Sequence, residues 1–423
     1  MSSCSRKRTK APRSARNRRN NGGFSTRSAE IVADLDDVLI QILTFLPIKS
    51  LLKSKRVSKR WLSLITNPDF SNRILKSKHP LPISGFFLKG THDMEYRFVS
   101  LDDDDKERIS SSLPLRFADH PTKMIILQST NGLLLCKCSC PSNQFDISYY
   151  VYNPSTKQNT LLPRIIDHVA ISLAFDPSKS PHYKVFCLKS VPDSNLFYIE
   201  VYSSNEGPWR RVVSVPSFTL PPTVMEFGNT IFWNDAVLWY GRRSRDCLSF
   251  DIYQEKIKIV PLPYLDHQEE EEEEEEEDGP PDVGRTLRFL DESRGNLYYT
   301  EVYDLSSSKF PVYEMERDGS NWSLKHNVDL EPLAAAFPEM IRTEHYTDRP
   351  IYAFSVIGIV KEETNAESYI LLHIPNQVLK YNFRNKTFKK LCGFKASLDI
   401  DVPGYEFYGF QRCFQFIESL ANV

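Results

Sequence analysis

The chain has 423 residues, of which 41% are hydrophobic and 12% aromatic, values typical of a protein that folds over most of its length. It contains no run of about 18 uncharged apolar residues, so the sequence predicts no membrane span. The net charge is only −2, which gives no overall electrostatic case for nucleic-acid binding.

Residues 1–30 form a basic segment with nine Lys/Arg and one acid. Because it has too little apolar surface to fold, we expect a disordered tail. Such a tract is typical of a nuclear-localisation signal or a weak nucleic-acid patch, while a transit peptide and a solvated tail without an address are alternatives. We therefore expect the protein in the nucleus and/or the cytoplasm.

A helical module is predicted over residues 31–78. Acidic residues at 34, 36 and 37 favour a helix start, apolar residues then recur at helical spacing, and Pro47 ends this first helix. Two further short helices follow, and Asn67-Pro68 ends the third. A unit of about 40 residues without disulfides or metal ligands is near the lower limit for independent stability. The pattern predicts either a docking module with apolar surface left for a partner, or a cap on the following domain.

The segment LPIKSLLKSKRVSKRWLSLI, residues 46–65, resembles the F-box of Skp–Cullin–F-box ubiquitin ligases. Leu46-Pro47 and the Val-Ser-Lys-Arg-Trp motif at 57–61 are in register with that family, whereas Asp36 stands where the family usually has proline. The resemblance implies a Skp-family adaptor and, through it, a cullin as partners, with docking weakened but not abolished by Asp36. The residues that it implies as adaptor contacts are Leu35, Leu39, Ile42, Leu43, Pro47, Leu51, Val57 and Trp61.

Residues 84–423 are predicted to form an all-β domain of repeated units. Each unit has an alternating strand, a polar turn and a second strand, and the units are spaced about 50 residues apart once insertions at 266–282 and near 332–349 are allowed for. The anchor positions of the repeat are Leu101, Tyr152, Tyr202, Phe250, Met315 and Tyr381. This period predicts a β-propeller of about six blades, with residues 413–420 pairing near 86–101 to close the ring. An irregular β-sandwich assembly is the alternative.

The motifs NGLLLC, VYNPSTKQ and LSFDIYQEK, at 131–136, 151–158 and 248–256, are similar to those of the F-box-associated domain of plant F-box proteins, which is related to kelch and galactose-oxidase propellers. The fold class is therefore multidomain, a small three-helix F-box followed by an all-β propeller-like domain. The acidic tract 266–282 is outside the family pattern, and we expect it to be a disordered loop between blades because consecutive like charges repel.

The sequence gives no sign of catalysis or metal binding. It lacks a phosphate loop, a nucleophile elbow and an HExxH motif. Cys136, Cys138 and Cys140 alternate as on a strand, and no second knuckle completes a zinc site, so we interpret them as the end of a strand. We predict a non-catalytic subunit without cofactor or metal.

The segment WNDAVLWYGRRSRD, residues 233–246, is the one candidate for target binding, because tryptophan, tyrosine and arginine are common interface residues. The candidate contacts are Trp239, Tyr240, Arg242, Arg243 and Arg245. Burial of the two tryptophans in a blade core is the alternative.

Together these features predict the substrate-recognition subunit of a ubiquitin ligase, with an unidentified protein target. A β-propeller enzyme or carbohydrate-binding module with a helical cap is one alternative, and a chromatin- or RNA-associated binder that uses the basic tail is another.

Overall fold

The computed structural model describes residues 36–90, 96–102, 109–110, 123–140, 143–221, 224, 227–241, 244–263, 287–302, 306–343, 350–364, 367–393 and 410–423. The basic tail 1–30, the acidic tract 266–282 and the candidate contacts Leu35, Arg242 and Arg243 lie outside the described residues.

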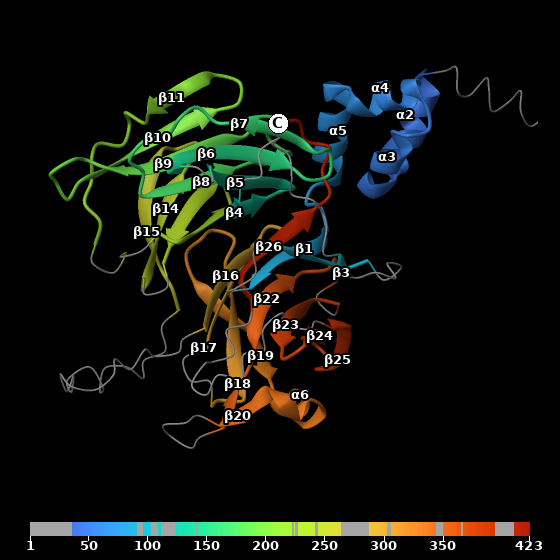
Figure 1. Cartoon of the computed structure of the whole chain (residues 1–423), viewed down its shortest axis with the longest axis vertical. Helices are drawn as coiled ribbons and strands as arrows, with labels where there is room; N and C mark the ends of the chain where they lie inside the picture. The colour runs from blue at the N-terminus through green and yellow to red at the C-terminus, as the bar shows by residue number, and fades with distance from the viewer. Residues whose placement is uncertain are drawn as a thin grey trace, which may run out of the picture.

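Four short helices open the described chain (Figure 1). Their bounds are α2 (Asp36–Phe45), α3 (Ile48–Ser54), α4 (Lys59–Thr66) and α5 (Pro68–Lys78). The break at Pro47 and the end of α4 before Asn67 confirm the predicted helix boundaries. The fourth helix was not predicted. The side chain of Asn67 accepts hydrogen bonds from the backbone N–H of Asp69 and Phe70, and Pro68 occupies the first turn, so the pair that ends α4 also starts α5.

Six four-stranded antiparallel sheets follow, which we number as blades 1 to 6 in chain order. Blade 1 consists of β26 (Phe410–Ile417), β1 (Ile83–Gly90), β2 (Arg97–Ser100) and β3 (Ile109–Ser110). Blade 2 consists of β4 (Lys123–Thr130), β5 (Leu133–Cys140), β6 (Asn143–Asn153) and β7 (Gln158–Leu161). Blade 3 consists of β8 (Ala170–Ala174), β9 (Lys184–Ser190), β10 (Phe197–Ser203) and β11 (Gly207–Arg211).

The second half of the domain repeats this plan. Blade 4 consists of β12 (Asn229–Trp233), β13 (Ala236–Tyr240), β14 (Asp246–Asp251) and β15 (Lys256–Pro261). Blade 5 consists of β16 (Leu287–Ser293), β17 (Asn296–Val302), β18 (Lys309–Met315) and β19 (Trp322–Asp329). Blade 6 consists of β22 (Ser355–Val360), β23 (Tyr369–Ile374), β24 (Gln377–Asn382) and β25 (Phe388–Gly393). Between blades 5 and 6 an insertion forms α6 (Glu331–Ala336), η1 (Pro338–Met340), β20 (Ile341–Thr343) and β21 (Pro350–Tyr352).

The predicted repeat is confirmed strand by strand. Every anchor residue lies on the third strand of a blade, except Leu101, which follows β2 directly. Ring closure is confirmed as well: β26 pairs with β1, with Phe86 opposite Gln415 and Leu88 opposite Cys413. The C-terminal strand therefore joins the sheet that begins the propeller, so that β1 is not left as an open sheet edge.

The first strands of blades 2, 3 and 4 lie against one another, and a buried side chain links them. Gln128 on β4 donates from Nε2 to the Leu173 carbonyl oxygen at 2.8 Å, and its Oε1 accepts from the Leu173 N–H at 2.7 Å and from Thr230 Oγ1 at 2.9 Å. The blades are separate sheets without backbone pairing between them, and the side-chain amide of Gln128 supplies hydrogen bonds across their boundaries.

The clustered cysteines of the sequence lie on a β-strand. Cys136 and Cys138 lie on β5 and are buried, and no group of three or more His, Cys, Asp or Glu among the described residues could hold a metal ion. No helix within the described ranges is long and apolar enough to span a membrane.

Candidate functional site

The Val-Ser-Lys-Arg-Trp motif at 57–61 starts α4 by a side-chain cap. Ser58 has extended backbone, and its Oγ accepts a hydrogen bond of 3.1 Å from the Trp61 N–H. This cap fixes the position of Trp61, whose half-buried side chain packs against the apolar core of the module.

Three of the expected adaptor contacts point inward. Leu39, Leu43 and Leu51 are buried, and they share one apolar cluster with Ile48 and Ile65 from the neighbouring helices. Their side chains have almost no exposed surface in the chain by itself, and their contact with a partner stays a prediction. Their physical role in this structure is to hold α2, α3 and α4 together, because three short helices must pack on each other before they can present a surface.

A different set of apolar side chains of the module is exposed. Phe45 is 85% exposed, Val57 65%, and Ile42 and Leu62 44% each. Ile42 and Val57 are among the predicted contacts, whereas Phe45 and Leu62 are not. Phe45 stands three residues after Ile42, which puts both on one face of α2. We call Ile42, Phe45, Val57 and Leu62 the outer apolar set. Pro47 is also exposed.

Asp36, which stands where the F-box family usually has proline, contacts Arg60. Oδ1 of Asp36 accepts a hydrogen bond of 2.9 Å from Arg60 Nε and lies 2.8 Å from Nη2 of the same guanidinium, and this ion pair connects the first turn of α2 to the first turn of α4. Both side chains are substantially exposed, so this ion pair contributes at most about 1 kcal/mol.

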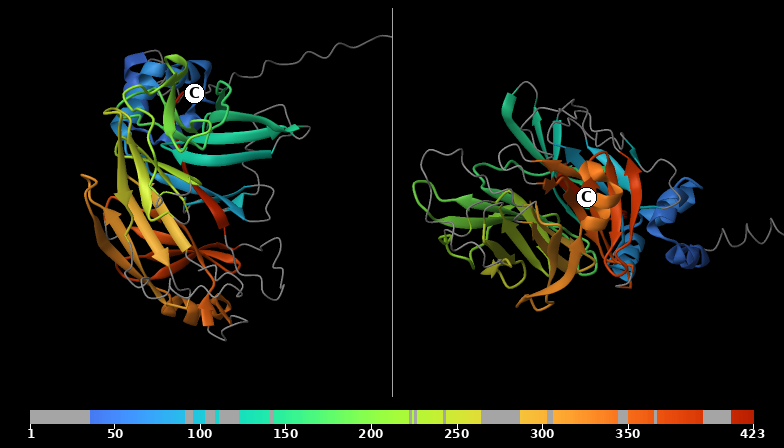
Figure 2. Two further views of the ribbon diagram at one scale, coloured as in Figure 1. Left: turned by 90° about the vertical axis from the view of Figure 1, so that its left-hand side faces the viewer. Right: turned by 90° about the horizontal axis from the view of Figure 1, so that it is seen from below.

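The helices are attached to the propeller on one side only. In Figures 1 and 2, α5 and the chain's C-terminus lie beside blades 1 and 2, while α2, α3 and α4 stand farther out. Lys49 on α3 pairs with Asp102 after β2, and His79 Nε2 lies 3.9 Å from Asp176 Oδ1 on blade 3. Buried apolar residues of the helices and of the propeller belong to one cluster. The cap interpretation thus describes α5, whose apolar residues are buried.

The last residues of the chain contribute to the contact between the helices and the propeller. Asn153 Nδ2, fully buried, donates to the carbonyl oxygens of Ser419 at 3.2 Å and Ala421 at 2.8 Å. Burial raises the pKa of Glu418, while the nearby ammonium groups of Lys49 and Lys53 on α3 act in the opposite direction. The C-terminal segment therefore lies between the propeller and the helices.

The second candidate site, at 233–246, is mostly a core element. Trp239 has 0% of its surface exposed and packs between blades 3 and 4, so its assignment as a target contact is corrected. Trp233 is also buried and donates from Nε1 to the Gly295 carbonyl oxygen at 3.0 Å. The Tyr240 hydroxyl donates to the Leu290 carbonyl oxygen at 3.1 Å and so links blade 4 to blade 5. Arg245 is the one exposed residue of the candidate set that the structure describes.

The structure combines a compact helical unit that presents apolar side chains with a six-bladed propeller. This combination is that of proteins in which an F-box is joined to a propeller. The F-box domain family matches residues 36–73, and the family described as F-box protein At3g26010-like, beta-propeller, matches residues 100–348, more than half of the chain. The chain therefore belongs to the F-box proteins with a β-propeller.

Similar proteins support this membership. F-box protein At5g07610 of Arabidopsis thaliana is 69% identical over 433 residues, covering 100% of both chains. F-box protein At5g49610 of the same plant is 25% identical over 387 residues, covering 87% of this chain and 93% of that protein. Among solved structures, the uncharacterized protein lmo1340 from Listeria monocytogenes matches at 10% identity with a TM-score of 0.34, over 75% of this chain and 82% of that chain.

Proposed function

We propose that this chain is the substrate-recognition subunit of a Skp–Cullin–F-box ubiquitin ligase. The helical module would dock a Skp-family adaptor and through it a cullin, and the propeller would hold a protein target. The observation that carries the proposal is the outer apolar set on a module whose inner leucines are already packed.

The number and position of exposed apolar side chains favour docking over simple capping. Of the twelve exposed large hydrophobic residues in the described part of the chain, four lie between Ile42 and Leu62. A helix that only covers the propeller would turn such side chains toward it, since apolar area left in water forfeits about 25 cal/mol per Å². Here the side of the module that meets the propeller carries α5, whose Phe70, Ile74 and Leu75 are buried, and the ion pair of Lys49 with Asp102.

The chemical work of such a subunit is positioning. A target held on the propeller and a ubiquitin-conjugating enzyme held through the cullin would form one assembly, in which the attack of a target lysine becomes effectively intramolecular. Tethering of this kind gives effective concentrations of the order of millimolar for short flexible links. The propeller would then need a binding surface and no catalytic group, in line with the role that F-box proteins generally have as non-catalytic adaptor subunits.

A pull-down tests this proposal. The immobilised wild-type chain should retain a purified Skp-family adaptor, and Val57→Asp, which places a charge on an exposed apolar position, should lose it. Trp61→Ala should also lose the adaptor, because a partly buried aromatic anchor is removed next to the same surface. Equal recovery of the adaptor by wild type and by both variants would overturn the proposal.

We also propose that the protein acts in the nucleus and/or the cytoplasm, which the basic composition of residues 1–30 supports. Deletion of residues 2–28 should move a fluorescent fusion out of the nucleus. An unchanged distribution would count against a nuclear-localisation role for the tail.

A further inference from the structure

Four large apolar side chains are exposed where blades 2 and 3 meet. Leu161, the last residue of β7, is 56% exposed, and Ile166 and Val169 on the loop that follows are 58% and 40% exposed. Val213, just after β11, is 85% exposed. We call Leu161, Ile166, Val169 and Val213 the junction set. Because single exposed apolar residues are common on protein surfaces, a binding site requires that these four lie on one surface.

Hydrogen bonds hold the segments that carry the junction set against each other. Residues 161–169 lead from the last strand of blade 2 to the first strand of blade 3. Trp209 on β11 donates from Nε1 to the Pro163 carbonyl oxygen at 3.1 Å, which joins this loop to the last strand of blade 3. At the other end of the loop, the Val169 N–H donates to the Leu188 carbonyl oxygen on β9 at 2.8 Å. The loop therefore crosses blade 3 from its last strand to its first, and the junction set lies along this crossing.

An oriented arginine lies beside the junction set. Arg211 on β11 is exposed, its Nη2 donates to Ser217 Oγ at 2.8 Å, and its Cζ lies 4.6 Å from the centroid of the Tyr198 ring. Both partners are uncharged, so they orient the guanidinium without neutralising it. The acidic residue opposite Arg211 in the strand register is Glu200, whose carboxylate pairs with Lys189 Nζ at 2.7 Å.

Further cations lie along the loop itself. The Tyr149 hydroxyl shares a hydrogen bond of 2.9 Å with His168 Nε2. Burial lowers the pKa of His168, and the ammonium groups of Lys137 and Lys189 lower it further, whereas the Asp167 carboxylate acts in the opposite direction. Both lysines are therefore close enough to the loop to act on it electrostatically. Arg164 of the loop is exposed. Cations outnumber acids among the charged side chains at this junction, which are Lys137, Arg164, Lys189, Arg211, Asp167 and Glu200.

The junction set and the F-box contact lie at opposite ends of one strand. Val169 directly precedes β8, and Asp176, which follows β8, lies 3.9 Å from His79 Nε2 at the end of α5. The five residues of β8 separate the two by roughly 16 Å, at about 3.3 Å per residue. A protein bound at the junction set would therefore leave the contact between the helices and the propeller undisturbed.

We propose that the junction set and its cations bind a segment of the target protein in which Asp or Glu side chains stand beside large apolar ones. Burial of the exposed apolar side chains supplies affinity at about 25 cal/mol per Å². The local excess of cations, in a chain whose net charge is −2, selects an acidic partner. Arg211 is of the residue type that is enriched at the centres of interfaces, and its orientation is already fixed in the free chain. The inference deepens the proposed function and rests on it only for the identity of the bound protein as a target.

Fluorescence anisotropy with the full-length chain tests the junction. The probe is a labelled peptide of three Glu-Leu repeats, and the matched peptides carry Lys in place of Glu or Ser in place of Leu. The wild type should bind the Glu-Leu peptide about tenfold more tightly than either matched peptide, because charge and apolar contact are both needed. Ile166→Ser/Arg211→Gln should weaken this binding by about tenfold or more, since one contact of each kind is lost.

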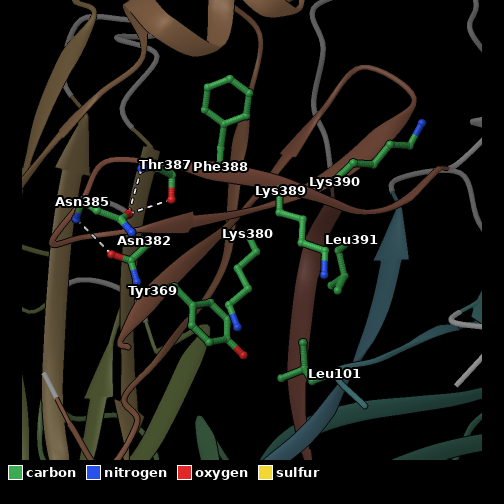
Figure 3. Close-up of a pocket in the computed structure, with 10 residues that line it drawn as sticks. All are labelled: Leu101, Tyr369, Lys380, Asn382, Asn385, Thr387, Phe388, Lys389, Lys390 and Leu391. Carbon is green, nitrogen blue, oxygen red and sulfur yellow. Dashed lines mark hydrogen bonds between the residues drawn. The ribbon is translucent and has the colours of Figure 1, made fainter. Parts of the chain in front are cut away.

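A matched double variant controls for general effects of charge and polarity. Leu324 on β19 is 57% exposed, close to the value for Ile166, and Lys390 on β25 is exposed. Lys390 lines a separate pocket in blade 6, where Figure 3 shows its side chain extending away from Tyr369 and Leu101. Leu324→Ser/Lys390→Gln should change the affinity for the peptide by less than about twofold, since isolated surface charges act weakly.

Stability measurements keep the test independent of folding. Both double variants should melt within about 3 °C of the wild type, because the changed side chains are exposed. Val213→Ser alone should also weaken binding of the Glu-Leu peptide. No binding of this peptide by the wild type, equal weakening by the control variant, or binding of a thymidine hexanucleotide as tight as that of the peptide would overturn the inference.

Adaptor retention is measured on the same preparations. Loss of the adaptor from the wild type with peptide binding intact would contradict the proposed ligase function and leave the junction assigned. Retained adaptor without peptide binding would contradict the junction alone.

Discussion

Gly358 on β22 lies directly against the ring of Phe86 on β1. A Cβ atom at position 358 would come within 2.5 Å of the Cε1 and Cζ atoms of Phe86, closer than real Cβ contacts allow. Phe86 is fully buried. The last blade and the first therefore meet at a point where only glycine fits, next to the pairing of β26 with β1 that closes the ring.

The first prediction concerns this contact. Gly358→Ala should lower the free energy of unfolding by about 1–3 kcal/mol, because the added methyl group overpacks a filled core. Gly228→Ala is the matched control, since no heavy atom lies within 4 Å of its Cβ position. Urea denaturation measures both changes, and equal stability of the two variants would contradict the close approach of the blades.

The second prediction concerns the amide at the centre of the propeller. Gln128→Leu should lower the free energy of unfolding by about 1–3 kcal/mol, because the buried Leu173 N–H and carbonyl oxygen lose their partner. Urea denaturation measures the free energy of unfolding of this variant and of Lys258→Gln, a control at an exposed position. A loss no larger than that of the surface variant would show that Gln128 does not link the blades.

The third prediction is a pH dependence that originates at Glu292 on β16. Burial, together with the charge of the neighbouring Asp291, raises the pKa of Glu292 from 4.5 to about 7, although the hydrogen bond from the Gly295 N–H acts in the opposite direction. The folded protein therefore keeps this proton at pH values where the unfolded chain releases it. The resulting stability is fully present below pH 4.5 and is lost as the pH rises toward about 7.

Glu292→Gln should remove this loss, because the amide retains an oxygen for the Gly295 N–H but cannot ionise. The variant should gain about 1–2 kcal/mol relative to the wild type between pH 5 and pH 8. Thermal unfolding over this pH range is the measurement. A difference between the two proteins that does not change with pH would contradict the buried position of the carboxyl group.

The β-repeat could be predicted from the sequence because its signal is local. The anchors Tyr152, Tyr202 and Phe250 mark third strands, since each sits before a polar turn that the chain must make at every blade. The pairing of β26 with β1 was predictable too, because a ring of sheets leaves an open edge unless the two chain ends meet.

The site was harder to predict, because exposure depends on contacts between elements distant in the sequence. The apolar stripe of α2 is wide, and only the packing of α3 and α4 decides that Leu43 points inward and Phe45 outward. In the same way Trp239 has the composition of an interface residue, but its neighbours in blade 3 bury it. The position of Arg211 beside Tyr198 follows from the pairing of β10 with β11, whose register the sequence alone does not specify.

The fourth prediction concerns the outer apolar set. Phe45→Ser/Val57→Asp should abolish adaptor binding while leaving the melting temperature within about 2 °C of the wild type, because both side chains are exposed and support no core contact. Leu324→Asp/Ile341→Ser changes two exposed apolar residues on β19 and β20 and serves as the matched control.

Isothermal titration of these proteins with a purified Skp-family adaptor tests the central claim, that the helical module keeps an apolar face for a partner. The wild type and the β19–β20 control should bind one adaptor with the same affinity, and the Phe45/Val57 variant should bind about a hundredfold more weakly or not at all. Equal affinities for all three proteins, or no binding by the wild type, would contradict the claim.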